Sequence, residues 1–355
     1  MKLRPNGEEF RVTNISVDWP MKTDRCIMMS IWKLRLSMAG TLVLIVGLST
    51  LFFTVILSLT GLFDSGYSGF LILGVLVGAF NVVQWLISPY IIDALYHVRA
   101  MSATEEPKLH EAVDDLSRKS NISKPRLMLA QIPLPNAFAY GSPVAGTRIA
   151  VTSGLLKTLD DGEVAAVVGH ELGHLRHRDV QIMMFVSLLP AVAYFVGYSL
   201  MLSGMFGGNQ KNQGNGAVIG TVFMAFSWIM NLFILNLSRL REYYADRHSA
   251  SIVDGGSEKL STGLAKIVNV SKNMGRMGRT RQQTKNLNAF KALFITDPDR
   301  ANVDSAEMPT MSVADSQKLV QEILSKKLTT ADRVAEVFST HPNIVKRLKA
   351  LKELA

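Results

Sequence analysis

Residues 161–179 of this chain, DGEVAAVVGHELGHLRHRD, decide how the rest of the sequence is interpreted. Apolar residues recur here at helical spacing after an acidic start, so the stretch predicts a helix. His170 and His174 stand four positions apart, which places both imidazoles on one helix face. Glu171 points to where an attacking water would sit. The spacing is that of a zinc hydrolase, and it nominates two metal ligands and a general base.

A third ligand has to come from elsewhere, because a catalytic zinc with two histidines usually takes one more protein ligand. His177 lies seven residues from His170, about 10.5 Å along a helix, so these two cannot share an ion. The best candidate is Glu242, within residues 238–246 (SRLREYYAD). Asp246 follows one turn later on the same face, from which it could orient a ligand histidine. A solvated, charged helix face is the alternative for both carboxylates.

The composition indicates a membrane protein. Hydrophobic residues make up 48% of the 355 positions and charged residues 19%, an unusual balance for a soluble chain. Four stretches without Asp, Glu, Lys or Arg are long enough to span a bilayer: 36–63, 65–92, 180–210 and 212–238. They predict membrane helices near 38–60, 69–91, 181–203 and 217–238. Buried helices of a large soluble domain are the alternative.

The flanks of these stretches predict their orientation. Lys and Arg gather before the first stretch, after the second and fourth and before the third, whereas the two outer loops contain Asp64 and Lys211. The N-terminus is therefore expected in the cytoplasm, and the protein in the cell membrane as a multi-pass protein. The His and Glu helices then meet at similar depth on the cytosolic face.

This topology divides the chain into alternating soluble and membrane parts. We expect a cytosolic extension (1–35), two spans (36–92), a first soluble segment with the His helix (93–179), two further spans (180–238) and a second soluble segment (239–355). The two soluble segments must associate into one domain. Within them, alternation predicts strands over 126–132 and 148–152, and helical spacing predicts a helix over 313–327.

Charge and cysteine content exclude other classes. The net charge of +9 comes without any motif that would organise it for nucleic acid, so no nucleic-acid partner is expected. Cys26 is the only cysteine, which excludes an intramolecular disulfide and a thiolate metal cage.

The chain resembles the HtpX family of membrane-integral zinc endopeptidases, relatives of the CAAX prenyl endoproteases. Besides the two helices above, the matching pieces are 136–141 (NAFAYG), 151–156 (VTSGLL) and 340–342 (THP) with Arg347. The resemblance implies an α+β, mostly helical fold, in which four transmembrane helices carry a gluzincin-type protease domain. It also implies one Zn²⁺ per subunit on His170, His174 and Glu242, with Glu171 as the base. The first 29 residues and residues 308–327 look additional to the family, and translation from Met28 or Met29 is an open alternative.

The resemblance suggests further site residues. His341 begins a matching segment and is a candidate oxyanion donor, the alternative being a capping or structural role before Pro342. Asn136, Ala137 and Phe138 would bind substrate beside the cleft, where an extended chain could pair with a strand edge, unless they form an ordinary hairpin. Arg347 is as compatible with holding an internal carboxylate as with meeting substrate.

The sequence thus predicts a membrane-bound zinc endopeptidase that cleaves misfolded or membrane proteins at the cytosolic face, in protein quality control and the stress response. Its partners would be unfolded or membrane polypeptides and the lipid bilayer. The alternatives are a CAAX-type prenyl-protein endoprotease and a catalytically silent metal-binding adaptor. A transporter is disfavoured because the predicted spans contain no Asp, Glu, Lys or Arg.

Overall fold

A computed structural model of the chain describes residues 68–206, 213–276 and 316–355. The predicted extension (1–35) and the predicted membrane helix near 38–60 lie outside the described residues. In the described part, helices surround one small four-stranded sheet, which confirms the mostly helical α+β class.

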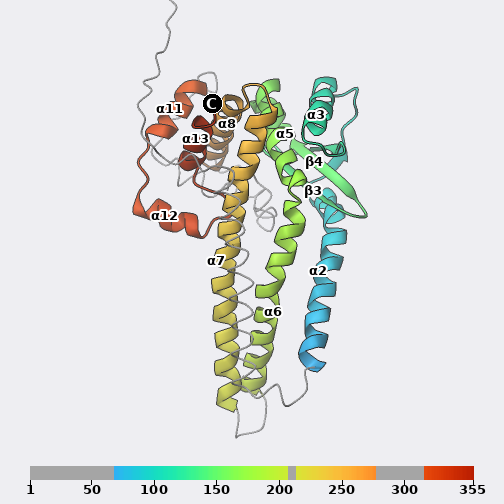
Figure 1. Ribbon diagram of the computed structural model, residues 1–355, viewed down its shortest axis with the longest axis vertical. Coiled ribbons are helices and arrows are strands. Elements are labelled where there is room, and N and C mark those ends of the chain that lie inside the picture. The colour runs from blue at the N-terminus through green and yellow to red at the C-terminus, as the bar shows by residue number, and fades with distance from the viewer. Residues whose placement is uncertain (1–67, 207–212, 277–315) are drawn as a thin grey trace, which may run out of the picture.

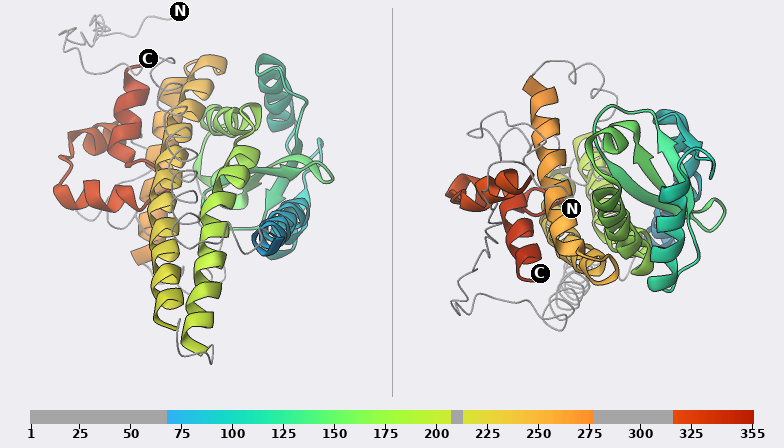
Figure 2. Two further views of the ribbon diagram at one scale, coloured as in Figure 1. Left: turned by 60° about the horizontal axis from the view of Figure 1, so that its bottom comes forward. Right: turned by 90° about the horizontal axis from the view of Figure 1, so that it is seen from above.

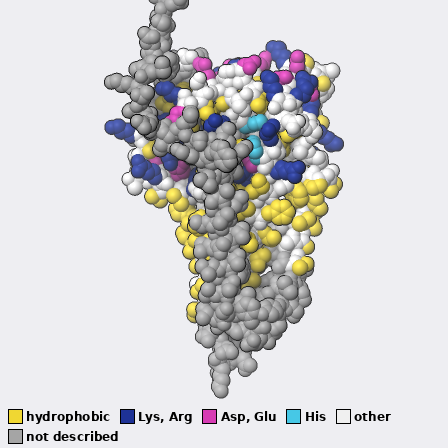
Figure 3. Space-filling view, viewed as in Figure 1, with side chains coloured by type: hydrophobic (Ala, Val, Ile, Leu, Met, Phe, Trp, Pro, Cys, Tyr) yellow, Lys and Arg dark blue, Asp and Glu magenta, His cyan; other side chains and the backbone are white. Residues whose placement is uncertain are grey.

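Three long apolar helices extend from one end of the molecule: α2 (Ser68–Leu95), α6 (Asp179–Phe206) and α7 (Gln213–Ile252). They match the second, third and fourth apolar stretches of the sequence. Among the described residues, Asp179–Leu202 and Gly216–Ile252 are long and apolar enough to cross a membrane. Large apolar side chains are exposed along all three helices: Val82, Ile87, Ile91, Phe185, Tyr198, Val222 and Ile229. Hydrophobic side chains gather below the charged upper part in Figure 3.

Two glycines allow α6 and α7 to pack backbone against backbone. A Cβ on Gly197 would stand 2.7 Å from the carbonyl oxygen of Gly220, and one on Gly220 would stand 2.5 Å from that of Gly197. Small residues at such crossings are what apolar helices use to associate in a membrane. Phe223 and Met230 are buried in the same contact, so α6 and α7 form a tight hairpin.

The sheet is built from β1 (Val98–Ala100), β2 (Arg126–Ala130), β3 (Ala137–Ser142) and β4 (Gly146–Thr152), in the order β1-β2-β4-β3. Both predicted strands are confirmed, as β2 and β4. β4 runs parallel to β2 and antiparallel to β3. β3 is therefore the end strand, and its outer edge pairs with no other strand of the described sheet.

Seven further helices complete the described structure: α3 (Pro107–Lys119), α4 (Ser153–Thr158), α5 (Asp161–Arg176), α8 (Gly256–Arg276), α11 (Ser316–Ser325), α12 (Thr330–Val337) and α13 (Ile344–Lys352). α11 confirms the helix predicted over 313–327. One hydrophobic core joins residues from both soluble chain segments, among them Ile149, Val167, Leu264 and Leu348. Viewed from above, α5, α7 and α8 separate the sheet from α11, α12 and α13 (Figure 2).

α5 and α7 approach each other closely because α5 presents glycines to its neighbour. A Cβ on Gly173 would stand 3.0 Å from the Cα of Ala245, and one on Gly169 would stand 3.1 Å from Oγ of Ser249. Gly169 and Gly173 are four residues apart and thus lie on one face of α5. The glycine inside the HELGH sequence therefore brings the His helix against the Glu helix.

α5 starts and stops at clear signals. Asp160 and Glu163 form a reciprocal capping box at its first turn. At its other end Arg178 adopts a left-handed conformation (φ 53°), and α6 begins at the next residue. This sharp turn places Asp179 back beside the histidines of α5.

Candidate metal centre

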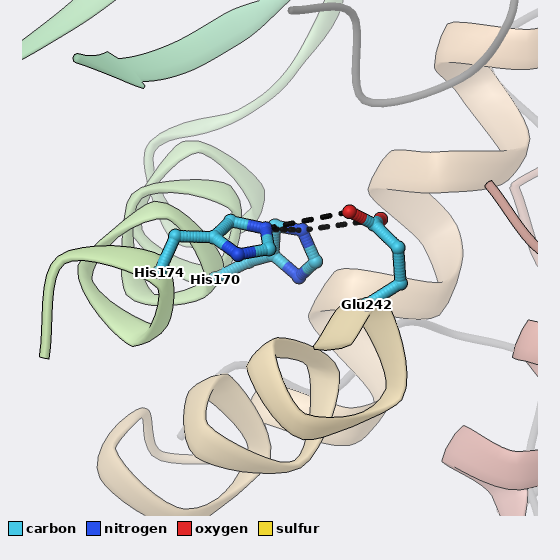
Figure 4. A group of neighbouring side chains, drawn as sticks. All are labelled: His170, His174 and Glu242. Carbon is cyan, nitrogen blue, oxygen red and sulfur yellow. Dashed lines mark hydrogen bonds and ion pairs between the residues drawn. The ribbon is translucent and has the colours of Figure 1, made fainter. Parts of the chain in front are cut away.

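Three side chains from two helices converge at the contact between α5 and α7 (Figure 4). Nε2 of His170 and Nε2 of His174 lie 3.2 Å apart. They stand 3.7 and 3.5 Å from the two carboxylate oxygens of Glu242. All three ligand atoms fall within 4.8 Å of one another. The structure therefore brings together the three residues that the sequence nominated as metal ligands.

Both histidines touch a carboxylate with the ring nitrogen that faces away from Glu242. Nδ1 of His170 lies 2.8 Å from Oδ1 of Asp246, as expected from the sequence. Nδ1 of His174 lies 2.6 Å from Oδ2 of Asp179. An ionised carboxylate only accepts hydrogen bonds, so a neutral ring with its proton on Nδ1 suits each of these contacts. In that tautomer the lone pair is on Nε2.

With this tautomer the site fits a cation, because two Nε2 lone pairs then lie 3.2 Å apart beside a buried carboxylate. Ligand atoms around a tetrahedral zinc ion stand roughly 3.3 to 3.6 Å apart, given metal–ligand distances of about 2.0 to 2.2 Å. The separations here, 3.2 to 3.7 Å, lie within about 0.1 Å of that range. Nitrogen with carboxylate oxygen is a donor set that zinc accepts.

Glu171 is held beside this group by the end strand of the sheet. The backbone N–H of Ala139 in β3 donates a 2.8 Å hydrogen bond to Oε2 of Glu171. Burial raises the pKa of the Glu171 carboxyl, while the adjacent histidines and the Ala139 N–H act in the opposite direction. A carboxylate that resists ionisation and is held in one orientation is suited to accept and return a proton.

Glu242 and Asp246 share a buried arginine from the C-terminal helix. Arg347 donates to Asp246 through Nε at 2.9 Å and Nη2 at 2.5 Å, and its Nη1 lies 3.2 Å from Oε2 of Glu242. Arg347 is only 1% exposed. Burial lowers the pKa of Arg347, but Asp246 and Glu242 outweigh it and raise that pKa overall. The alternative that Arg347 holds an internal carboxylate is therefore the one the contacts support.

His341 contacts Glu242. Its Nδ1 stands 3.1 Å from Oε2 of Glu242, and its Nε2 is buried without a hydrogen-bond partner in the described part of the chain. The capping alternative is wrong, because Asn343 caps α13 by accepting from the backbone N–H of Val345.

A cavity of about 250 Å³ opens over these groups. It is lined by Phe138, Ala139, His170, Glu171, His174, Asp179, Val180, Met183, Ser238, Arg241, Glu242, Thr340 and His341. Of the three predicted substrate-binding residues, Phe138 lines the cavity. Asn136 is not among the lining residues, and its backbone exchanges hydrogen bonds with Thr152. Ala137 is fully buried in the core.

Two participants were missed by sequence reasoning. Asp179 contacts His174 and also pairs with Arg241, whose Nη2 lies 2.9 Å from Oδ2. Asp179 and its partner Arg241 are charged residues next to the ends of apolar stretches, and that position could have nominated them. The second missed participant is Ala139, which acts through its backbone N–H, a group that side-chain chemistry cannot signal. His177 points elsewhere: its ring packs against Tyr244 at a centroid distance of 4.1 Å.

The arrangement is that of a metalloprotease: an H-E-x-x-H helix faces a glutamate from a second helix, with Glu171 beside them. Residues 103–355 match Peptidase family M48, and the chain belongs to that family. Its relatives are proteases of the HtpX type.

A protease HtpX homolog of Thermoplasma acidophilum is 40% identical over 276 residues, covering 77% of this chain and 82% of the relative. Protease HtpX homolog 2 of Saccharolobus solfataricus is 36% identical over 334 residues, covering 91% of this chain and 98% of the relative. The predicted family and metalloprotease activity are thereby confirmed.

The crystal structure of S. mikatae Ste24p shares the fold, with a TM-score of 0.52 at 16% identity. The alignment covers 90% of this chain and 66% of Ste24p. The remaining third of Ste24p lies outside this alignment.

Proposed function

We propose that this membrane protease is a zinc-dependent endopeptidase that cleaves misfolded or membrane proteins at the cytosolic membrane face. The convergence of His170, His174 and Glu242 beside Glu171 carries the proposal. The position of this group supports the place of action, since Asp179 and Val180, which line the cavity, begin the apolar helix α6.

Each of these residues has a different role in the proposed hydrolysis of the peptide bond. Zinc bound by His170, His174 and Glu242 would supply Lewis-acid chemistry, polarising the peptide carbonyl and acidifying a water. Glu171, held by the Ala139 N–H, accepts the proton of the attacking water and returns a proton to the leaving amine. His341 in its imidazolium form, in which both ring nitrogens donate, would direct Nδ1 at Glu242 and Nε2 at the oxyanion that develops on the carbonyl.

An extended substrate would lie along the outer edge of β3. That edge pairs with no other strand of the described sheet, and Phe138 and Ala139 in it line the cavity. Pairing through main-chain groups tolerates many side chains, which suits an enzyme that degrades diverse unfolded polypeptides.

Membrane topology forms part of the proposal. We infer four spans in the cell membrane, with α2, α6 and α7 as the last three and 38–60 as the first. The N-terminus and the catalytic domain, from chain segments 93–179 and 239–355, are then cytoplasmic, because Lys and Arg flank the stretches on that side. The exposed apolar side chains of α2, α6 and α7 support lipid around these helices.

The comparison with relatives weighs against the first alternative function, and the position of Glu171 weighs against the second. A CAAX-type prenyl-protein endoprotease shares the metal site, but the chain spans only 66% of Ste24p and up to 98% of the HtpX homologs. A catalytically silent adaptor would have no need of a base, whereas Glu171 stands in position beside the ligands.

The test is cleavage of an unfolded casein-like substrate by detergent-purified protein, with the metal content measured in parallel. Wild type should cleave, and Glu171→Gln should retain metal and lose activity, because the amide cannot accept the proton. Glu163→Gln is the matched control, since Glu163 is buried in the same helix but pairs with Lys266 at the far end. Equal activity of wild type and Glu171→Gln would reject the proposed base.

A further inference from the structure

Helix α12 has its polarity reversed relative to an ordinary surface helix. Its two acidic side chains face inward, with Asp332 8% and Glu336 7% exposed. Its apolar side chains face outward, with Val334 55%, Val337 42% and Phe338, just past the helix, 55% exposed. Helices of soluble domains place these residue types the other way round.

The inward carboxylates are structural and hold α12 in this orientation. Asp332 accepts from the backbone N–H and the hydroxyl of Thr329, each at 2.8 Å, in a capping box. Glu336 accepts from the backbone N–H of Asn343 at 3.1 Å and pairs with Lys346. The outward apolar stripe is therefore a fixed feature of the fold.

The C-terminal end of α12 is fastened to α7 where the charge-free stretch of α7 ends. Arg239, the first charge after residues 212–238, donates to the carbonyl oxygens of Glu336, Val337 and Ser339 at 2.8, 3.1 and 2.8 Å. Phe338 continues along α7 to Trp228, at a ring-centroid distance of 6.3 Å. Figure 1 shows α12 beside α7, on the side of the domain toward the long helices.

The apolar stripe thus continues an apolar surface already present on α7. Trp228 is 57% exposed and Ile229 43% exposed on that helix. The exposed charges nearest the stripe are basic: Lys327 before α12 and Arg333 within it. An amphipathic helix with outward apolar residues and basic flanks fits the interface of a bilayer with anionic lipids.

We propose that α12 and Phe338 form a monotopic anchor that lies in the headgroup region of the bilayer. Val334, Val337 and Phe338 enter the acyl boundary, and Lys327 and Arg333 meet the anionic headgroups. This inference rests on the proposed membrane position of α7. The anchor also bears on the active site, because only Ser339 and Thr340 separate Phe338 from His341, which lines the cavity.

The test measures the depth of spin labels in the full-length protein, reconstituted in vesicles of equimolar phosphatidylcholine and phosphatidylglycerol. On a Cys26→Ser background, single cysteines replace Val334, Val337 or Phe338 and receive a nitroxide label. Val222→Cys on the exposed face of α7 is the lipid control, and Lys108→Cys on α3 is the aqueous control. The accessibility of each label to oxygen and to a water-soluble nickel chelate is compared.

The proposal expects the α12 labels to resemble Val222→Cys, with an oxygen-to-nickel accessibility ratio several-fold above that of Lys108→Cys. Water-like labels on α12 beside a lipid-like Val222→Cys would overturn the anchor and leave the span of α7 intact. Low accessibility of the α12 labels to both reagents would show protein contact instead of lipid and also overturn it. A water-like Val222→Cys would remove the membrane position of α7 and the anchor together.

Discussion

Asp179 holds His174 by the ring nitrogen opposite Glu242, with Oδ2 2.6 Å from Nδ1. The contact crosses a chain turn, since His174 belongs to α5 and Asp179 begins α6. A carboxylate in this place fixes the tautomer and the orientation of the ring, and it makes the other ring nitrogen a better ligand. The membrane helix thereby takes part in positioning a candidate metal ligand.

Removal of this contact should weaken metal binding. We expect Asp179→Ala to lower zinc affinity by about 10- to 100-fold, because the His174 ring loses its orientation and its basicity. Competition with a chromogenic chelator measures this directly. Asp161→Ala is the control, since Asp161 is an exposed carboxylate on α5 that pairs with Lys108. Unchanged affinity in Asp179→Ala would show that the turn alone orients His174.

Metal removal should inactivate and destabilise the enzyme. A chelator should abolish peptide cleavage, and zinc should restore it. A ligand that binds only the folded state at 100 times its Kd stabilises by about 2.7 kcal/mol, so the melting temperature should fall on chelation and recover with zinc. Glu242→Gln is the matched control, because without its carboxylate the melting temperature should respond little to zinc. An equal response of both proteins would place the metal elsewhere.

His341→Phe separates a role in turnover from a role in metal binding. The phenyl ring keeps much of the volume but has no Nε2 donor, so turnover should drop by about 10²- to 10³-fold while zinc content changes little. Parallel loss of metal and activity would instead make His341 part of the metal-binding framework, through its contact with Glu242.

Arg347 is expected to matter for stability. Its replacement by Leu would leave Asp246 and Glu242 buried without their guanidinium, and broken buried pairs cost about 3–5 kcal/mol. The melting temperature of detergent-purified Arg347→Leu should drop sharply. Lys349→Leu on the same helix is a surface comparison, since Lys349 is exposed. A drop no larger in Arg347→Leu than in Lys349→Leu would contradict the buried ion network.

Gly173→Val tests why the HELGH helix contains a glycine. Even a Cβ would stand 3.0 Å from the Cα of Ala245, so a valine must push α5 away from α7. We expect loss of zinc affinity together with activity, since His174 and Glu242 then separate. Gly162→Val in the first turn of α5 is the control, because a Cβ there meets the flexible end of Lys259.

The parts of the site predicted from sequence are those governed by helical periodicity. The four-residue spacings of His170 with His174 and of Glu242 with Asp246 fix which side chains share a face, and the structure brings these faces together. Alternation likewise located β2 and β4. Periodicity is local, however, and it stops where a regular element stops.

The missed contacts lie beyond that range. Asp179 reaches His174 only through the left-handed turn at Arg178, a conformation that no repeat in the sequence indicates. The Ala139 N–H meets Glu171 because β3 happens to be the end strand, which depends on the sheet order. Asn136, one residue before β3, is not among the residues that line the cavity.

The helical hairpin of α6 and α7 has a consequence for the newly made chain. His170 and His174 precede the hairpin in the sequence and Glu242 follows it, so a chain still short of residue 242 has only part of the ligand set. The third ligand comes into place only when α7 has docked on α5 and α6. The candidate metal centre is therefore complete only after residue 242 has been synthesised and α7 packs against α5.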